Sequence, residues 1–171
     1  MINAAVEIGR VPGFKPIYET DGSIASGNQI ISGKYIRLKT TSSVTNVIPC
    51  LGADVIATTG SILGVAADDT NTLPYNGLYN VLDNYYKYGY ISAYVNGGLF
   101  TVWNDGRGSV FAASTYSGTA VTGAPLYIAD ATGELTTALG DDSGTIGQIQ
   151  VGVLVRAPAD ANSTLLYKAI V

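Results

Sequence analysis

The amino-acid sequence predicts an all-β protein, because apolar residues recur at the period of a strand and turn residues interrupt them at short intervals. Glycine accounts for 21 of the 171 residues, and charged residues make up 13% of the chain. "LPYNGLYNVLDNYY", residues 73–86, comes nearest to a helical spacing, but a glycine and asparagines weaken it, so at most a short turn is expected there. We expect residues 69–84 to form a long loop. We expect residues 31–171 to form one antiparallel β-barrel or jelly-roll-like sandwich.

Short strands are predicted before residue 70. In "KYIRLKTT", residues 34–41, Ile36 and Leu38 alternate with larger polar side chains, which is typical of a half-exposed or edge strand. "NVIPCLGADVIATTG" and "SILGVAADD", residues 46–69, give two or three further strands. Pro49 predicts an edge strand or a bulge, because proline has no N–H to donate to a neighbouring strand.

The stretch "YISAYVNGGLFTVWNDGRG" predicts a β-hairpin. Asn96-Gly97, or the pair Gly97-Gly98, has the residues of a tight turn, since glycine adopts positive φ without strain. A strand ending near Val95 would then pair across that turn with one running from about Leu99 to Trp103.

The remainder of the chain predicts four more strands. "APLYIADATGELTTAL" contains two of them, joined by a turn at Thr132-Gly133. "IGQIQVGVLVRAP" and "TLLYKAIV" are the last two, and Pro158 and Asn162 lie in the loop between them.

The first 30 residues show no sustained pattern, and two prolines forbid a central strand, so we expect an extended arm. Residues 1–39 carry five basic and three acidic groups, a net of +2, whereas the remaining residues carry four and ten, a net of −6. Arg10 and Lys15 are the basic residues of the arm. Such an arm suits an acidic partner or subunit, although an ordinary solvated surface accounts for the charge equally well.

Several kinds of chemistry are excluded or disfavoured by composition. The chain has no histidine, which removes histidine-based triads and the commonest zinc ligand. Cys50 is the single cysteine and lies in an apolar run, which favours a small buried hydrophobe. Adjacent acids in "GVAADDTNT" and "GDDSGTIG" lack the spacing of a calcium loop, so we interpret them as solvated turns. We predict no catalytic, metal or cofactor site.

Tyrosines are concentrated in "YYKYGYISAYV", residues 85–95. In a strand, Tyr86, Tyr88, Tyr90 and Tyr94 would share one face and form a row of rings. Three uses of this row remain open: packing on the protein's own sheet, contact with a neighbouring subunit, and stacking on sugars. Nucleic-acid binding is not expected, because the only cation among these tyrosines is a single lysine.

Neither a signal-peptide pattern nor a run of about 18 apolar residues occurs in the sequence, so we expect no membrane association. We expect the protein to be made and kept in the cytoplasm until assembly.

Four pieces of the chain, spread over roughly residues 45–171, occur in an order that resembles a known family. They are "GVAADD", Gly97-Gly98-Leu99-Phe100, "PLYIADATGELTT" and the glycine-punctuated apolar strand "IGQIQVGVLVRAP". In this order they resemble the head decoration, or capsid cement, proteins of tailed bacteriophages.

That resemblance implies a β-rich, non-enzymatic virion protein that binds the major capsid protein on the outside of an icosahedral head, often as a homotrimer. It would be made in the host cytoplasm and would stabilise the mature shell by mass action. On this hypothesis, residues 1–30 reach the shell or an adjacent subunit, and the tyrosine row helps to build the homo-oligomer. The alternative is a carbohydrate-binding or host-adhesion module of a phage particle, in which the same tyrosines stack on sugars.

Overall fold

The computed structural model describes the residue ranges 5–8, 17–19, 30–38, 47–52, 62–67, 90–95, 97–104, 108–139 and 150–170. Within these ranges the chain forms eleven strands and one 3-10 turn. They are β1 (Ala5–Ile8), β2 (Ile17–Glu19), β3 (Tyr35–Leu38), β4 (Val47–Pro49), β5 (Ile62–Ala66), β6 (Tyr90–Tyr94), β7 (Leu99–Val102), η1 (Ala113–Thr115), β8 (Pro125–Ile128), β9 (Leu135–Thr136), β10 (Gly152–Arg156) and β11 (Leu165–Ala169).

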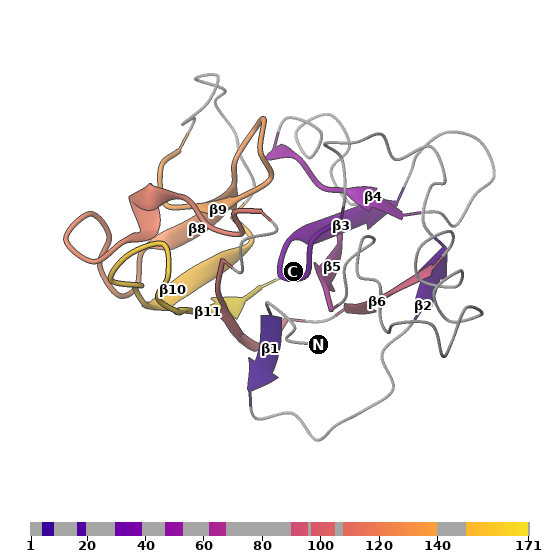
Figure 1. Cartoon of the computed structure of the whole chain (residues 1–171), viewed down its shortest axis with the longest axis horizontal. Helices are drawn as coiled ribbons and strands as arrows, with labels where there is room; N and C mark the ends of the chain where they lie inside the picture. Colours follow the sequence, from indigo (N-terminus) through magenta and orange to yellow (C-terminus); the bar gives the residue numbers. More distant parts are fainter. Residues whose placement is uncertain are drawn as a thin grey trace.

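The named strands pair antiparallel and form two sheets. One has six strands in the order β1-β7-β11-β10-β8-β9, and the other has five in the order β2-β6-β5-β3-β4. In Figure 1 the strands β8 to β11 lie at the left and β2 to β6 at the right. The two sheets pack as a sandwich, which confirms the predicted all-β class and selects the sandwich from the two expected architectures.

The main core lies between the sheets. Phe100, Leu154 and Tyr167 point into it from the six-stranded sheet, and Tyr35 and Val65 point into it from the five-stranded sheet. Each of these five side chains is at most 1% exposed. Because alternate residues of a strand face opposite sides, their chain neighbours in the six-stranded sheet face away from this core.

The five-stranded sheet has a second, smaller core on its other face. Ile36, Ala66 and Ala93 are fully buried there, and each of them follows or precedes a residue that packs in the main core. Of the two alternatives predicted for β3, the edge strand is wrong, because β3 lies between β4 and β5. Arg37 and Leu38 are half-buried, as a half-exposed strand requires, whereas Tyr35 and Ile36 are buried. The sequence pattern suggested a polar face for β3, but the Tyr35 side chain on that face is buried and its hydroxyl is hydrogen-bonded.

The predicted hairpin of β6 and β7 is also wrong, although both strands exist. β6 pairs with β2 and β5, whereas β7 pairs with β1 and β11, so the chain changes sheets between them. The glycines there allow close approach to the end of β11. The Gly98 carbonyl accepts a 2.7 Å hydrogen bond from the Ala169 N–H, and a Cβ on Gly97 would lie 2.8 Å from the Ala169 carbonyl oxygen.

Other predicted elements are confirmed. β8 and β9 form a hairpin whose turn holds Gly133 at a φ of 68°. β10 and β11 pair antiparallel, and Pro158 and Asn162 lie between them. Pro49 ends β4, which is an edge strand as proline requires.

Only parts of the predicted arm fall within the described residues. β1 pairs with β7 and β2 pairs with β6, and each is the outermost strand of its sheet. Arg10 and Lys15 lie outside the described residues, as does the predicted loop 69–84.

Two buried tyrosines meet in the main core but differ in their hydrogen bonding. The Tyr35 hydroxyl donates to the Val151 carbonyl at 3.1 Å, which joins β3 to the segment before β10. The Tyr167 hydroxyl is buried beside that of Tyr35. It forms no hydrogen bond of ordinary geometry with the described residues, but the interaction between the two hydroxyls contributes to the pKa of each. Burial raises the pKa of both hydroxyls above the ordinary value of 10, so both remain protonated at neutral pH.

Removing each tyrosine hydroxyl should therefore have different effects on stability. Tyr35→Phe loses a buried hydrogen bond and should lower the free energy of unfolding by about 1 kcal/mol. Tyr167→Phe loses only the weaker interaction with the Tyr35 hydroxyl, so it should lower that free energy by less than Tyr35→Phe does. Urea denaturation of the two variants and the parent measures both values. A greater loss for Tyr167→Phe than for Tyr35→Phe would contradict this assignment.

Gly64 is required where β5 passes β6. Its φ is +153°, and a Cβ on it would collide with the Tyr94 carbonyl oxygen. Gly64→Ala should therefore lower the free energy of unfolding by about 3 kcal/mol or more. Gly118→Ala is the control, because Gly118 also has positive φ, at +92°, but its Cβ would meet nothing within 4 Å. The control should lose only about 1 kcal/mol, by thermal or urea unfolding.

Candidate interaction surface

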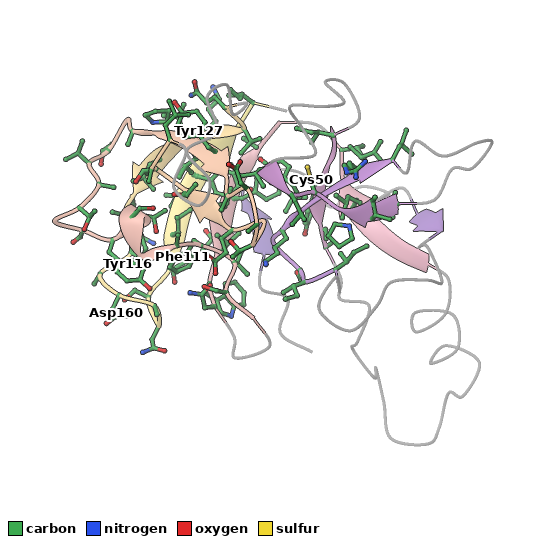
Figure 2. The ribbon with its side chains drawn as sticks, turned by 90° about the horizontal axis from the view of Figure 1, so that it is seen from above. Cys50, Phe111, Tyr116, Tyr127 and Asp160 are labelled. Carbon is green, nitrogen blue, oxygen red and sulfur yellow. The ribbon has the colours of Figure 1, made fainter. Side chains whose placement is uncertain are left out.

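The described residues offer no cluster of metal-ligating side chains. They contain no group of three or more histidine, cysteine, aspartate or glutamate residues placed to hold a metal ion. Cys50 is 1% exposed, as its apolar surroundings in the sequence predict, and it lies where the two sheets meet (Figure 2). No helix within the described ranges has the length and hydropathy needed to span a membrane.

Lys34 forms a hydrogen bond between segments of the two sheets. Its Nζ donates to the Thr132 carbonyl at 2.8 Å, which ties the start of β3 to the turn between β8 and β9. Burial lowers the pKa of Lys34, and the negative charge of Glu134 partly offsets that effect. The Glu134 carboxylate also accepts a 3.2 Å hydrogen bond from the Thr132 hydroxyl. These contacts give Lys34 a structural role, in which it links the two sheets.

The predicted tyrosine row is only partly within the described residues. Tyr86 and Tyr88 lie outside them, and for Tyr90 the structure gives the backbone alone, in register with Glu19 of β2. Tyr94 packs against the main core, where its ring meets that of Phe100 edge-on at a centroid distance of 5.2 Å. This member of the row therefore serves the protein's own packing, the first of the three uses left open.

A different surface has the composition of a contact site: the face of the six-stranded sheet that points away from the main core. We call it the outer face. We count its described members on four adjacent strands, β7, β11, β10 and β8, and at the residue after β7. On β9, Thr136 pairs with Tyr127 but is buried and hydrogen-bonded to Ser114, so it is not counted. The members are Leu99, Thr101 and Trp103; Leu166 and Lys168; Val153, Val155 and Arg156; and Pro125 and Tyr127. None of them belongs to either buried core, and all are half-buried or exposed.

Strand register brings these residues into rows across the sheet. Lys168 pairs with Leu99 on one side and with Val153 on the other, and Val153 pairs in turn with Pro125. A second row runs from Thr101 through Leu166 to Arg156. Paired residues of antiparallel strands point to the same side, so each row is continuous across the face.

The second row ends at a bulge in β10. The register shifts between Leu154 and Arg156, so Val155 is the extra residue on that strand. Val155 is 38% exposed, which is unusual for a valine within a sheet. The bulge thus turns an apolar side chain outward at the edge of the outer face.

The outer face is apolar and weakly basic. Its members other than Thr101, Arg156 and Lys168 are apolar or aromatic, and they include the only tryptophan of the chain. None of its members is acidic, although the whole chain has a net charge of −4. An antiparallel sheet with one face in water normally has polar residues on that face, so this composition is typical of a surface that meets another molecule.

The loops at one end of the six-stranded sheet are held firmly beside the outer face. We call residues 116–124 and 157–164 the loop end. The Ser117 N–H donates to the Pro158 carbonyl at 2.8 Å, and the Thr122 hydroxyl donates to the Val155 carbonyl at 3.1 Å. Val121 is 74% exposed at this end. A second apolar side chain is therefore displayed next to the outer face on a well-braced loop.

Local hydrogen bonds also order the loop between β10 and β11. The Asp160 carboxylate accepts hydrogen bonds from the Ser163 hydroxyl at 2.9 Å and from the Asn162 N–H at 2.8 Å. These bonds lower the pKa of Asp160, which lies at the tip of the loop in Figure 2. The rings of Phe111 and Tyr116 meet edge-on at a centroid distance of 6.1 Å, and this contact supports the loop of residues 116–124. Both loops are thus shaped by the chain itself.

The outer face was missed in the sequence, although a signal for it is present. "LFTVW", "GVLVR" and "LLYKA" have apolar residues at both alternating positions, which predicts strands that are covered on both sides. A scan of protein-family models finds no match to the chain, and a search of curated proteins finds none either.

The distinction between core and outer face is measurable with two adjacent leucines. Leu165 is fully buried in the main core, whereas Leu166 is half-buried on the outer face. Leu165→Ala should lower the free energy of unfolding by about 3 kcal/mol, and Leu166→Ala by about 1 kcal/mol or less. Urea denaturation gives both values. Equal losses would show that the outer face is packed as tightly as the core.

Proposed function

We propose that this chain is a structural protein of a bacteriophage virion, a head decoration or cement protein that binds the outside of the assembled capsid and stabilises it. The observation that carries the proposal is the apolar outer face of the six-stranded sheet, which the described fold does not bury. A protein that works by adhesion needs such a face and needs no catalytic group.

The pieces of sequence that carry the resemblance to cement proteins have structural positions. "GVAADD" includes the end of β5, and Leu99-Phe100 begin β7. "PLYIADATGELTT" spans β8, its turn and β9, and "GVLVR" is β10. These strands supply much of the main core and, through their alternate residues, much of the outer face. The resemblance and the surface therefore involve the same elements, and this agreement supports the proposal.

The partner in this proposal is the major capsid protein, and the protein acts as a homo-oligomer, with a trimer preferred by the resemblance. Binding to the mature shell alone adds the binding free energy to the stability of that state by mass action. Arg10 and Lys15 of the arm contribute contacts to an acidic surface of the shell or of a neighbouring subunit. Tyr86, Tyr88 and Tyr90 contribute to contacts between subunits.

Capsids stripped of decoration test the proposal. The purified protein should co-sediment with mature, expanded shells at a saturating ratio and should raise the temperature at which the shells lose their contents, because it binds the intact state. Immature shells are the matched control and should bind less. The double variant Arg10→Ala, Lys15→Ala tests the arm and should bind more weakly, with a smaller dependence on salt.

Absence of binding to any shell would contradict the proposal. So would saturable binding of the free protein to a glycan array, which would favour the adhesion alternative. Mass photometry of the protein alone gives the oligomeric state, and a monomer at all concentrations would remove the trimer from the proposal.

A further inference from the structure

We propose that the outer face is the surface that docks on the shell, and that its occupant is an apolar patch of the capsid protein bordered by acidic side chains. This inference rests on the proposed function, and it assigns a partner to one particular face. The other candidates for that face are a second copy of this chain and no partner at all.

The outer face has the residues that dominate the energetics of protein contacts. Trp103 and Tyr127 lie on it together with an arginine, and these three residue types are enriched where binding energy is concentrated. Leu166 and Val153 occupy adjacent strands between them. Side chains of this kind gain by leaving water and lose little conformational freedom, since the aromatic ones rotate about two bonds only.

The outer face is also rigid before it meets a partner. Its strands are hydrogen-bonded to neighbours on both sides, from β7 through β11 and β10 to β8. Behind it, Phe100 stacks on Tyr167 at a centroid distance of 5.6 Å, and Leu154 is 1% exposed. A surface that is already ordered loses less entropy on binding than a flexible one.

The charges on the outer face distinguish a different partner from a second copy of this chain. Lys168 lies within the first row of the face and Arg156 at the end of the second, and none of the described members of the face is acidic. Two copies of this face in a two-fold contact would bring these cations together without compensation. A partner whose apolar patch is bordered by carboxylates satisfies them, so we infer the capsid protein as the occupant in preference to a second copy.

The size of the face explains why the protein would act as an oligomer. Four strands about 4.8 Å apart and about five residues long cover a flat area of only some 300 Å². A standard interface covers about 800 Å² on each partner. One copy is therefore a weak binder, and joined copies that present the same face to symmetric sites on the shell bind more tightly through avidity.

Three single variants and the stripped mature shells test the assignment. Trp103→Ala removes the largest side chain of the face and should weaken binding at least tenfold, and Lys168→Glu reverses its charge and should weaken binding at least fivefold. Leu139→Ser is the control, since Leu139 is exposed and apolar but follows β9 and belongs to neither the outer face nor the loop end. It should bind as the parent does. Co-sedimentation over a range of concentrations gives each affinity, and thermal melting establishes that each variant is folded.

The possible results separate the inference from the proposed function. If the parent binds and the two outer-face variants bind equally well, the inference is overturned and the proposed function stands. If the variants instead dissociate the oligomer by mass photometry, the outer face joins copies of this chain and the inference is again wrong. If the parent itself does not bind, both fall. Should Trp103→Ala fail to fold, Lys168→Glu still decides, because Lys168 is an exposed residue.

Discussion

The packing of aromatic rings between the two sheets is the constraint on which the rest of the structure depends. Phe100 stacks on Tyr167 within the six-stranded sheet, and Tyr94 meets Phe100 edge-on from the five-stranded sheet. The Tyr35 hydroxyl, on β3 of the five-stranded sheet, donates a hydrogen bond to the carbonyl of Val151, which precedes β10 of the other sheet. Because buried rings do not compress, these contacts set how far apart the sheets lie and which residues of each strand point inward. The outward residues, and hence the outer face, follow from the same alternation.

Much of the fold was predictable from the sequence, because it depends on local rules. Alternation located the strands, Pro49 marked an edge, and the turn at Gly133 joined β8 to β9. The partner of each strand was not predictable in the same way. The sequence at Gly97 and Gly98 predicts a hairpin turn, but in the structure these glycines allow the backbone to lie close to the end of β11. A glycine that supplies positive φ and a glycine that makes room for another backbone look identical in a sequence.

The candidate surface was harder to predict for a related reason. Alternation tells which residues share a face, but it does not tell what covers that face. Tyr94 belongs to a conspicuous row of tyrosines and packs in the main core, whereas Leu166 lies in an ordinary apolar run and is displayed on the outer face. In a sandwich, a strand with apolar residues on both sides has a second layer over it in its own chain or in a partner. Only the arrangement of the two sheets distinguishes these cases.

The low charge of the chain links the outer face to its proposed role. A monomer that displays an apolar face usually relies on surrounding charges to prevent random association. In this protein only 13% of the residues of the whole chain are charged. Lys168 and Arg156 therefore have a double effect on the face where they lie. They repel a second copy of the same face, and they attract a partner that carries acids, so the same two cations oppose self-association and favour a different occupant. In the proposed role, specificity comes from a few charges placed on an apolar surface, and affinity comes from repeating that surface around the shell.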